Sequence, residues 1–184
     1  MKIYVDTEFT GLHKNTTLIS VGLVDDDGNT FYGEFTDYDK TQVNEWITEN
    51  VIGKLYLEQP VSLDGQNVCV KGDSEFIKSE LLKWLGNYDE VSFVIDVGHY
   101  DFVLLIDLLY GSGLAVPDNV SKAYLELNND IALYKGLSIT DAFDYSREEI
   151  FKEVREEQLP INKHNALYDA IIIRGIYHGL HDIS

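Results

Sequence analysis

The amino-terminal 36 residues alternate short apolar runs with turn-forming residues, a pattern typical of β-strands. Three runs rich in β-branched and aromatic residues predict strands at Ile3–Glu8, Leu18–Val24 and Thr30–Phe35. The cluster Asp25–Asn29 contains an Asp-Gly pair and predicts a hairpin turn between the second and third strands. We therefore expect the chain to begin with three antiparallel strands.

Beyond residue 40 the spacing of apolar residues becomes that of helices. Five segments place apolar residues three or four positions apart: 42–52, 74–85, 100–110, 146–156 and 165–179. Asp73 and Gly86 flank the second segment as an expected N-cap and a C-terminal glycine. The apolar run Val91–Ile95 predicts a buried strand before the third segment. The stretch Ala115–Tyr134, interrupted by the turn cluster Asn128–Asp130, predicts no clear element.

This order of elements predicts one α/β domain over residues 1–184. Three antiparallel strands followed by alternating helices and strands are expected to form one mixed sheet flanked by helices. A hydrophobic content of 45% is enough for the core of a single domain, and no linker or internal repeat divides the chain.

The charge of the chain is strongly acidic. There are 14 Lys and Arg residues against 32 Asp and Glu residues, which gives a net charge of −18 at pH 7. That balance argues against a nucleic-acid binder that relies on a basic patch. An acidic protein can still act on phosphates if it holds divalent cations, because the cations supply the positive potential that the side chains lack. It could also imitate a nucleic acid and bind a protein partner.

The single cysteine, Cys69, excludes an intramolecular disulfide and a thiolate zinc cluster. A charge appears already at Asp6, so the amino-terminal sequence does not provide the apolar stretch of a signal peptide. The apolar run Phe102–Tyr110 is interrupted by Asp107 and is too short to span a bilayer. We therefore expect a cytoplasmic protein that does not enter membranes.

The first candidate site lies at the end of the first predicted strand. Asp6 and Glu8 are two residues apart, so a strand directs both carboxylates to the same face. Two adjacent carboxylates repel each other unless they are protonated or bridged by cations. Taken alone, the pair fits either a metal site or two solvated charges.

Two later segments contribute further acids and a histidine. Asp101 opens the third predicted helix, where the helix dipole alone would also favour an acid, and Asp96 at the preceding strand end is a competing candidate. Asp169 lies among apolar residues of the last predicted helix, where an unpaired carboxylate would be costly. His164 can face Asp169 only from the loop before that helix, and Pro160 just upstream favours such a break.

Taken together, these segments resemble the three motifs of the DEDDh family of 3′-to-5′ exonucleases, which have an RNase H-like fold. The segment Asp6–Leu12 is similar to the family's Asp-x-Glu motif with its Thr-Gly-Leu continuation. The pair Tyr100-Asp101 resembles its aromatic-Asp motif, and His164–Asp169 resembles its His-x₄-Asp motif. Within the family, the start of the chain and the second strand at 18–22 most resemble the small mycobacterial-type exoribonucleases, and the resemblance covers residues 2–180.

The resemblance implies a hydrolase with two bound metal ions. The ligands of two Mg²⁺ or Mn²⁺ ions would be Asp6, Glu8, Asp101 and Asp169, with His164 as the general base. The residues that bind the 3′-terminal nucleotide would be Phe9, Thr10, Gly11, Leu12 and Tyr100.

The implied activity is release of 5′-mononucleotides from the 3′ end of single-stranded RNA. A DNA 3′-5′ exonuclease is an alternative within the same class. An acidic protein-binding or nucleic-acid-mimic module with a vestigial site is an alternative from another class, although the complete set of four carboxylates and His164 argues against decay. An RNase H-type endonuclease would not require the His-x₄-Asp segment. Dimers occur among proteins of this type, which leaves a homodimer open.

Overall fold

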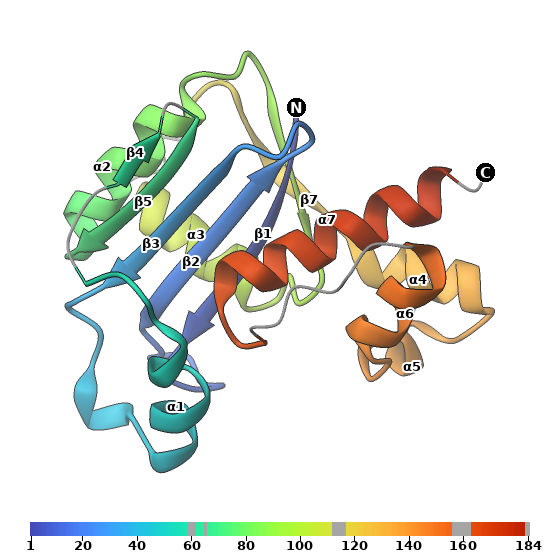
Figure 1. Cartoon of the computed structure of the whole chain (residues 1–184), viewed down its shortest axis with the longest axis horizontal. Helices are drawn as coiled ribbons and strands as arrows, with labels where there is room; N and C mark the ends of the chain where they lie inside the picture. Colours follow the sequence, from blue (N-terminus) through green and yellow to red (C-terminus); the bar gives the residue numbers. More distant parts are fainter. Residues whose placement is uncertain (59–61, 65, 112–116, 156–162, 183–184) are drawn as a thin grey trace.

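The computed structural model describes residues 1–58, 62–64, 66–111, 117–155 and 163–182. In these residues one mixed sheet has the strand order β4-β5-β3-β2-β1-β6-β7 (Figure 1). The strands are β1 (Lys2–Phe9), β2 (Leu18–Asp25), β3 (Thr30–Phe35), β4 (Ser62–Asp64), β5 (Asn67–Gly72), β6 (Val91–Ile95) and β7 (Val120–Glu126). The pairs β1–β2, β2–β3 and β4–β5 are antiparallel, whereas β3–β5, β1–β6 and β6–β7 are parallel. The predicted mixed α/β sheet is confirmed.

The helices that cover the sheet follow the predicted segments, with local differences. They are α1 (Glu45–Asn50), α2 (Ser74–Leu85), α3 (Asp101–Tyr110), α4 (Leu127–Lys135), α5 (Ile139–Phe143), α6 (Arg147–Val154) and α7 (Ala166–Asp182), with short 3₁₀ turns at Lys40–Gln42 and Ile52–Lys54. The expected helix over 42–52 is shorter, because the Asn44 side chain accepts the Ile47 N–H and starts α1 there. Asp73 and Gly86 cap α2 as expected. None of the described helices is long and apolar enough to cross a membrane.

The segment around the turn cluster Asn128–Asp130 forms β7 and then α4, which the residue pattern did not predict. Asn128 is fully buried near the start of α4, and its side-chain amide donates to the backbone carbonyl of Asp96. A tertiary hydrogen bond therefore satisfies a polar side chain that in isolation favours a turn. The expected break at Pro160 and the end of the segment 146–156 at Glu156 lie outside the described residues.

The sheet separates two apolar cores because alternate residues of its strands face opposite sides. Ile3 and Val5 of β1 belong to the core on the side of α2 and α3. Tyr4, between them in sequence, belongs to the core formed with α4, α6 and α7. In Figure 1, α7 runs across one face of the sheet, and α2 and α3 lie behind the other.

Close contact between β2 and the start of α7 depends on Gly22. A Cβ atom at this position would lie 2.3 Å from backbone atoms of Ala166 and Leu167. Gly22 is the cross-strand partner of Asp6 on β1. The absence of a side chain at residue 22 therefore allows the first turn of α7 to lie directly beside Asp6.

Candidate functional site

A cavity of about 600 Å³ opens where the carboxyl ends of β1 and β6 meet the amino ends of α3 and α7. Its wall includes seven of the residues predicted to act at the site: Asp6, Glu8, Phe9, Leu12, Asp101, His164 and Asp169. Asp96, Arg147, Glu148 and Lys163 also line it. Segments far apart in the sequence thus converge on one hollow at the edge where parallel strands end, a common location for ligand sites in α/β sheets.

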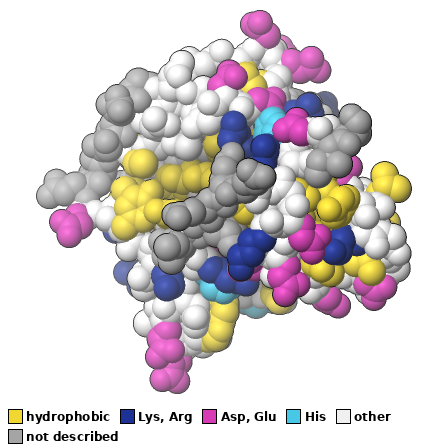
Figure 2. Space-filling model, turned by 45° about the vertical axis from the view of Figure 1, so that its right-hand side comes forward, with side chains coloured by type: hydrophobic (Ala, Val, Ile, Leu, Met, Phe, Trp, Pro, Cys, Tyr) yellow, Lys and Arg dark blue, Asp and Glu magenta, His cyan; other side chains and the backbone are white. Residues whose placement is uncertain are grey.

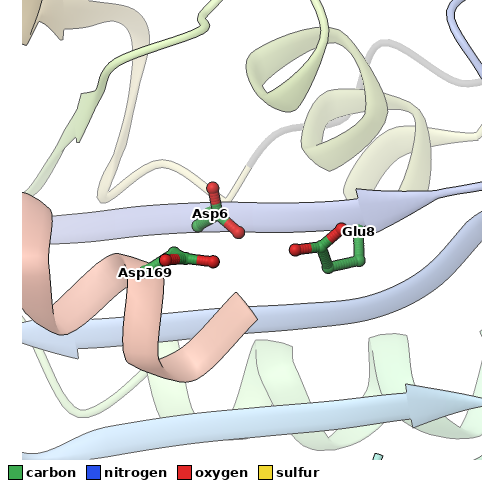
Figure 3. Close-up of side chains that lie close together, drawn as sticks. All are labelled: Asp6, Glu8 and Asp169. Carbon is green, nitrogen blue, oxygen red and sulfur yellow. The ribbon is translucent and has the colours of Figure 1, made fainter. Parts of the chain in front are cut away.

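Asp6, Glu8 and Asp169 form the centre of this cavity. Each offers one carboxylate oxygen, and these oxygens lie within 4.8 Å of one another. Figure 3 shows Asp169 reaching from α7 toward Asp6 and Glu8, which project from the same side of β1. Strand alternation explains why Asp6 and Glu8 share one face. The close approach of α7 at Gly22 explains why Asp169 lies beside them.

Asp6 also belongs to a second group of acids, with Asp96 and Asp101, whose oxygens lie within 4.8 Å of one another. The Asp101 carboxylate is fixed by Thr7, whose backbone N–H and hydroxyl donate to its Oδ1 at 3.1 and 2.5 Å. Asp96 instead forms an ion pair with Arg147, at 2.7 Å from Nε to Oδ2. The two competing candidates, Asp101 at the start of α3 and Asp96 at the end of β6, thus both lie beside Asp6, and only Asp96 has an ion-pair partner among the described residues.

Burial, together with repulsion from neighbouring carboxylates, disfavours the ionised forms of these acids. Burial, reinforced by Asp169 and Asp101, raises the pKa of Glu8 to about 8. Burial also raises the pKa of Asp101 to about 8, against the hydrogen bonds from Thr7, and that of Asp169 to about 7. Burial and the surrounding carboxylates raise the pKa of Asp6 well above its usual range.

Asp6 Oδ2 is buried and has no hydrogen-bond partner among the described residues. Buried polar atoms are nearly always paired, so an orphan oxygen inside a cluster of acids needs a compensating ligand. A divalent cation would satisfy this oxygen and would also return the neighbouring carboxyls to their ionised forms. The donor set therefore fits oxygen-preferring cations such as Mg²⁺ or Mn²⁺.

His164 lies in the loop before α7 and is the only described non-glycine residue with a positive φ, 64°. Its backbone N–H donates to Asp169 Oδ2 at 2.9 Å, so the loop is fixed directly to the acid cluster. The edge of the Trp46 indole packs against the imidazole, with ring centroids 5.2 Å apart. Burial and the nearby Lys163 lower the pKa of His164, which keeps the ring neutral and able to accept a proton near pH 7.

Only some of the residues expected to bind a nucleotide line the cavity. Phe9 and Leu12 line the cavity, and the Leu12 side chain is 75% exposed. Tyr100 is not part of the wall but stacks on Phe9, with centroids 5.3 Å apart and planes 14° from parallel. Thr10 is buried away from the cavity wall, where its hydroxyl donates to Gln42 at 2.5 Å. Gly11 also lies off the cavity wall, and its N–H donates to the Thr16 hydroxyl.

The residue patterns did not indicate that three further residues would contact the candidate site or its loop: Arg147, Asn165 and Trp46. Arg147 follows the N-cap Ser146 and precedes two acids, so it looks like part of an ordinary helix start, yet its guanidinium binds Asp96 and Asn128. Asn165 adjoins His164 and is fully buried. These roles depend on contacts between distant segments, which spacing along the chain does not reveal.

Lys163 forms an ion pair with Glu148 at the cavity wall, with 2.9 Å between Nζ and Oε1. The hydrogen bond from Lys163 lowers the pKa of Glu148 to about 2. The two cations of the cavity wall, Lys163 and Arg147, are therefore both paired with acids. A phosphate group in this cavity would meet little uncompensated positive charge from side chains.

Comparison with known proteins adds an independent observation. Residues 1–179 match the family described as the 3′-5′ exoribonuclease Rv2179c-like domain. The chain is 30% identical over 100 residues to the 3′-5′ exoribonuclease Rv2179c of Mycobacterium tuberculosis strain H37Rv, which covers 50% of this chain and 58% of that protein. An equal match is found to the 3′-5′ exoribonuclease MT2234.1 of strain CDC 1551. The matched region thus spans little more than half the length of these curated relatives.

Solved structures share the fold at low sequence identity. The nuclease domain of 3′hExo, a DEDDh family member bound to rAMP, has a TM-score of 0.68 at 13% identity and covers 100% of this chain and 92% of its own. The RNase domain of the yeast Pop2 protein has a TM-score of 0.66 at 15% identity, and the match covers 100% of this chain and 77% of that chain. These likenesses confirm that the chain has the fold of these two domains.

Proposed function

The chain belongs to the Rv2179c-like family of 3′-5′ exoribonuclease domains, and from that membership we propose that it is a metal-dependent 3′-5′ exonuclease. It would remove 5′-mononucleotides one at a time from the 3′ end of single-stranded RNA. The observation that carries the proposal is the meeting of Asp6, Glu8 and Asp169 around a buried, unpaired carboxylate oxygen. Such a cluster suits divalent cations and would otherwise be costly.

The proposed ligands divide into two groups that share Asp6. Asp6, Glu8 and Asp169 would hold one divalent ion, and Asp6 with Asp101 a second. When bound, a pair of Mg²⁺ or Mn²⁺ ions supplies the positive charge that activates a water molecule and stabilises the departing 3′ oxygen. Thr7 supports this arrangement because its two hydrogen bonds hold the Asp101 carboxylate toward Asp6.

His164 is the proposed general base. It would accept the proton of the attacking water at an imidazole nitrogen, which its lowered pKa leaves free near neutral pH. The hydrogen bond from its backbone to Asp169 sets the distance between this base and the acid cluster. The base and the ligand Asp169 therefore belong to one loop–helix junction.

The terminal nucleotide would lie against Phe9 and Leu12, which line the cavity beside the acids. Tyr100 would support Phe9 through their stacked rings. Stacking on aromatic rings is available to every base, so this surface suits single strands of any sequence. Thr10 and Gly11 would act indirectly, by shaping the loop that carries Leu12.

The preference for RNA rests on the family and on its curated relatives, which are described as exoribonucleases. We also propose a cytoplasmic location, because a single cysteine suits a reducing compartment. A homodimer stays an expectation from the resemblance alone.

One gel experiment tests the proposal. Single-stranded RNA labelled at its 5′ end should shorten stepwise in Mg²⁺, and matched DNA should shorten more slowly. A blocked 3′ end should prevent the reaction, and EDTA should abolish it. Asp169→Ala, with its fold verified by circular dichroism, should be inactive. Internal cleavage, degradation of the 3′-blocked RNA or full activity of the Asp169→Ala variant would overturn the assignment.

A further inference from the structure

We propose that Asn165 is a positioning residue for His164, and that the Tyr32 hydroxyl holds Asn165 in place. The inference rests on the proposed function, because it concerns the residue assigned there as the base. It adds a buried polar connection between the sheet and the loop that carries His164, formed by two side chains that do not line the cavity. The backbone carbonyl of Asn165 also accepts the N–H of Asp169 at 3.0 Å.

The His164 backbone requires such a support. Its φ of 64° lies in the left-handed region, which is unfavourable for a residue with a side chain. A strained conformation persists only where the surroundings impose it. The hydrogen bond from its N–H to Asp169 restrains one side of the residue. The peptide that follows it needs a second restraint.

Asn165 supplies that second restraint. Its side chain is fully buried, and its amide Nδ2 donates to the Tyr32 hydroxyl at 2.9 Å and to the Lys54 carbonyl at 3.2 Å. A backbone carbonyl only accepts hydrogen bonds, so the contact with Lys54 fixes which end of the amide faces this way. Asn165 therefore ties the residue after His164 both to the sheet and to the turn that follows α1.

Tyr32 is itself rigidly held. It lies fully buried on β3, and its hydroxyl donates to Glu34 Oε1 at 3.1 Å. Glu34 also accepts the backbone N–H groups of Tyr56 and Leu57 and pairs with Lys71 at 3.1 Å. The Tyr56 ring stacks on Tyr32, with centroids 4.9 Å apart and planes 10° from parallel. The Tyr32 hydroxyl therefore has a defined position. Because its proton is donated to Glu34, its oxygen can accept the hydrogen bond from Asn165.

The segment that provides the Lys54 carbonyl also carries Trp46, whose indole edge packs against the His164 imidazole. The segment from Trp46 to Lys54 therefore helps to position both the imidazole ring and the backbone of His164. Truncation of the Asn165 side chain would remove its bonds to Tyr32 and Lys54, neither of which is a proposed metal ligand, and would free the loop that holds the base. The expected consequence is slower turnover with unchanged metal affinity.

A double-mutant cycle tests this role. Asn165→Ala and Tyr32→Phe are each made in the wild-type chain and in His164→Ala, with kcat and KM measured on single-stranded RNA and Mn²⁺ affinity measured by calorimetry. Misplacing a catalytic group costs roughly 10- to 100-fold in rate. We therefore expect kcat to fall about 10-fold or more for Asn165→Ala, less for Tyr32→Phe, with KM and Mn²⁺ affinity within about twofold. In the His164→Ala background neither change should slow the enzyme further.

Tyr4→Phe is the matched control. Tyr4 is also fully buried on the same face of the sheet, and its hydroxyl donates to a carboxylate, Asp26, at 2.8 Å. It should lower stability like Tyr32→Phe and leave kcat unchanged. If Asn165→Ala fails to fold, Tyr32→Phe carries the test.

The outcomes separate the two claims. Equal rate losses with and without His164, or a normal kcat in the folded anchor variants, would overturn the positioning role alone. A wild-type rate in His164→Ala itself would overturn the assignment of the base, and the positioning role with it.

Discussion

At the scale of single residues, the chemistry of the cluster depends on Asp6, which both groups of acids share. The spacing of Asp6 and Glu8 predicted their common face, because strand alternation is a local rule. It did not predict that Asp6 Oδ2 would be left without a partner. It also could not predict that Arg147 would neutralise Asp96, because the two are 51 positions apart and meet only in the fold.

The raised pKa values predict how the stability of the metal-free protein depends on pH. Glu8, Asp101 and Asp169 titrate at about 8, about 8 and about 7 in the folded state, whereas unfolded carboxyls titrate near 4. Between these values the folded state binds protons that the unfolded state does not, so the free energy of unfolding rises as the pH falls. The stabilisation is complete below the unfolded pKa and is lost as the pH rises through the folded values. Thermal unfolding in EDTA should show Tm increasing from about pH 8 toward about pH 5.

Glu8→Gln is the control for this effect, because it removes one of the repelling charges and should flatten the dependence. Saturating Mg²⁺ should raise Tm strongly at pH 8 and little at pH 5, where the carboxyls are protonated. A metal-free Tm that stays constant over this range, or rises with pH, would contradict the proposed electrostatics.

At the scale of elements, the sequence predicted best where a local signal fixed the structure. Strand β3 and helix α2 have the expected bounds, the latter because Asp73 caps its first turn and Gly86 follows its last. Strand β7 and helix α4 were not predicted, because Ser121 and Lys122 interrupt the apolar pattern of β7 and the first turn of α4 carries turn-forming residues. Their stability comes from pairing with β6 and from packing against α7, which are tertiary contacts.

The junction of β2 and α7 gives a test at this scale. Gly22→Val would place side-chain atoms where the α7 backbone lies, since even a Cβ would be 2.3 Å from Ala166 and Leu167. The first turn of α7 must move, which carries Asp169 away from Asp6. We expect a loss of about 1–3 kcal/mol in the free energy of unfolding together with at least 10-fold weaker Mn²⁺ binding, measured by urea unfolding and calorimetry.

Gly53→Ala is the comparison variant for this junction. Its added Cβ would meet only ordinary contact, 3.4 Å from the Thr48 carbonyl. Stability and Mn²⁺ affinity should stay near the wild-type values. Normal Mn²⁺ binding in Gly22→Val would show that the approach of α7 does not position Asp169.

At the scale of the whole molecule, the net charge of −18 has to be reconciled with the proposed nucleic-acid substrate. Figure 2 shows Lys and Arg side chains interspersed with Asp and Glu on one face. Described cations such as Arg147, Arg155 and Lys163 have acid partners. In the cavity, where the described cations Arg147 and Lys163 are both paired, side chains offer a phosphate little free positive charge. The proposed divalent cations would then be the source of attraction.

Composition favours this requirement, because an acidic chain needs cations to meet a phosphate, but composition alone also fits a protein that imitates a nucleic acid. The order of the motifs predicted which acids would meet. Composition and motif order could not predict the buried contacts that support these acids, such as that of Asn165 with Tyr32. These two residues are 133 positions apart, and nothing in a single sequence indicates that they meet.

We propose that the acid cluster binds two divalent ions through a shared Asp6. Anomalous diffraction from crystals soaked in Mn²⁺ with a 5′-mononucleotide locates these ions. We expect two anomalous peaks about 3.5–4 Å apart, one among Asp6, Glu8 and Asp169 and the other between Asp6 and Asp101. A cluster without a peak, or manganese bound only elsewhere on the protein, would contradict it.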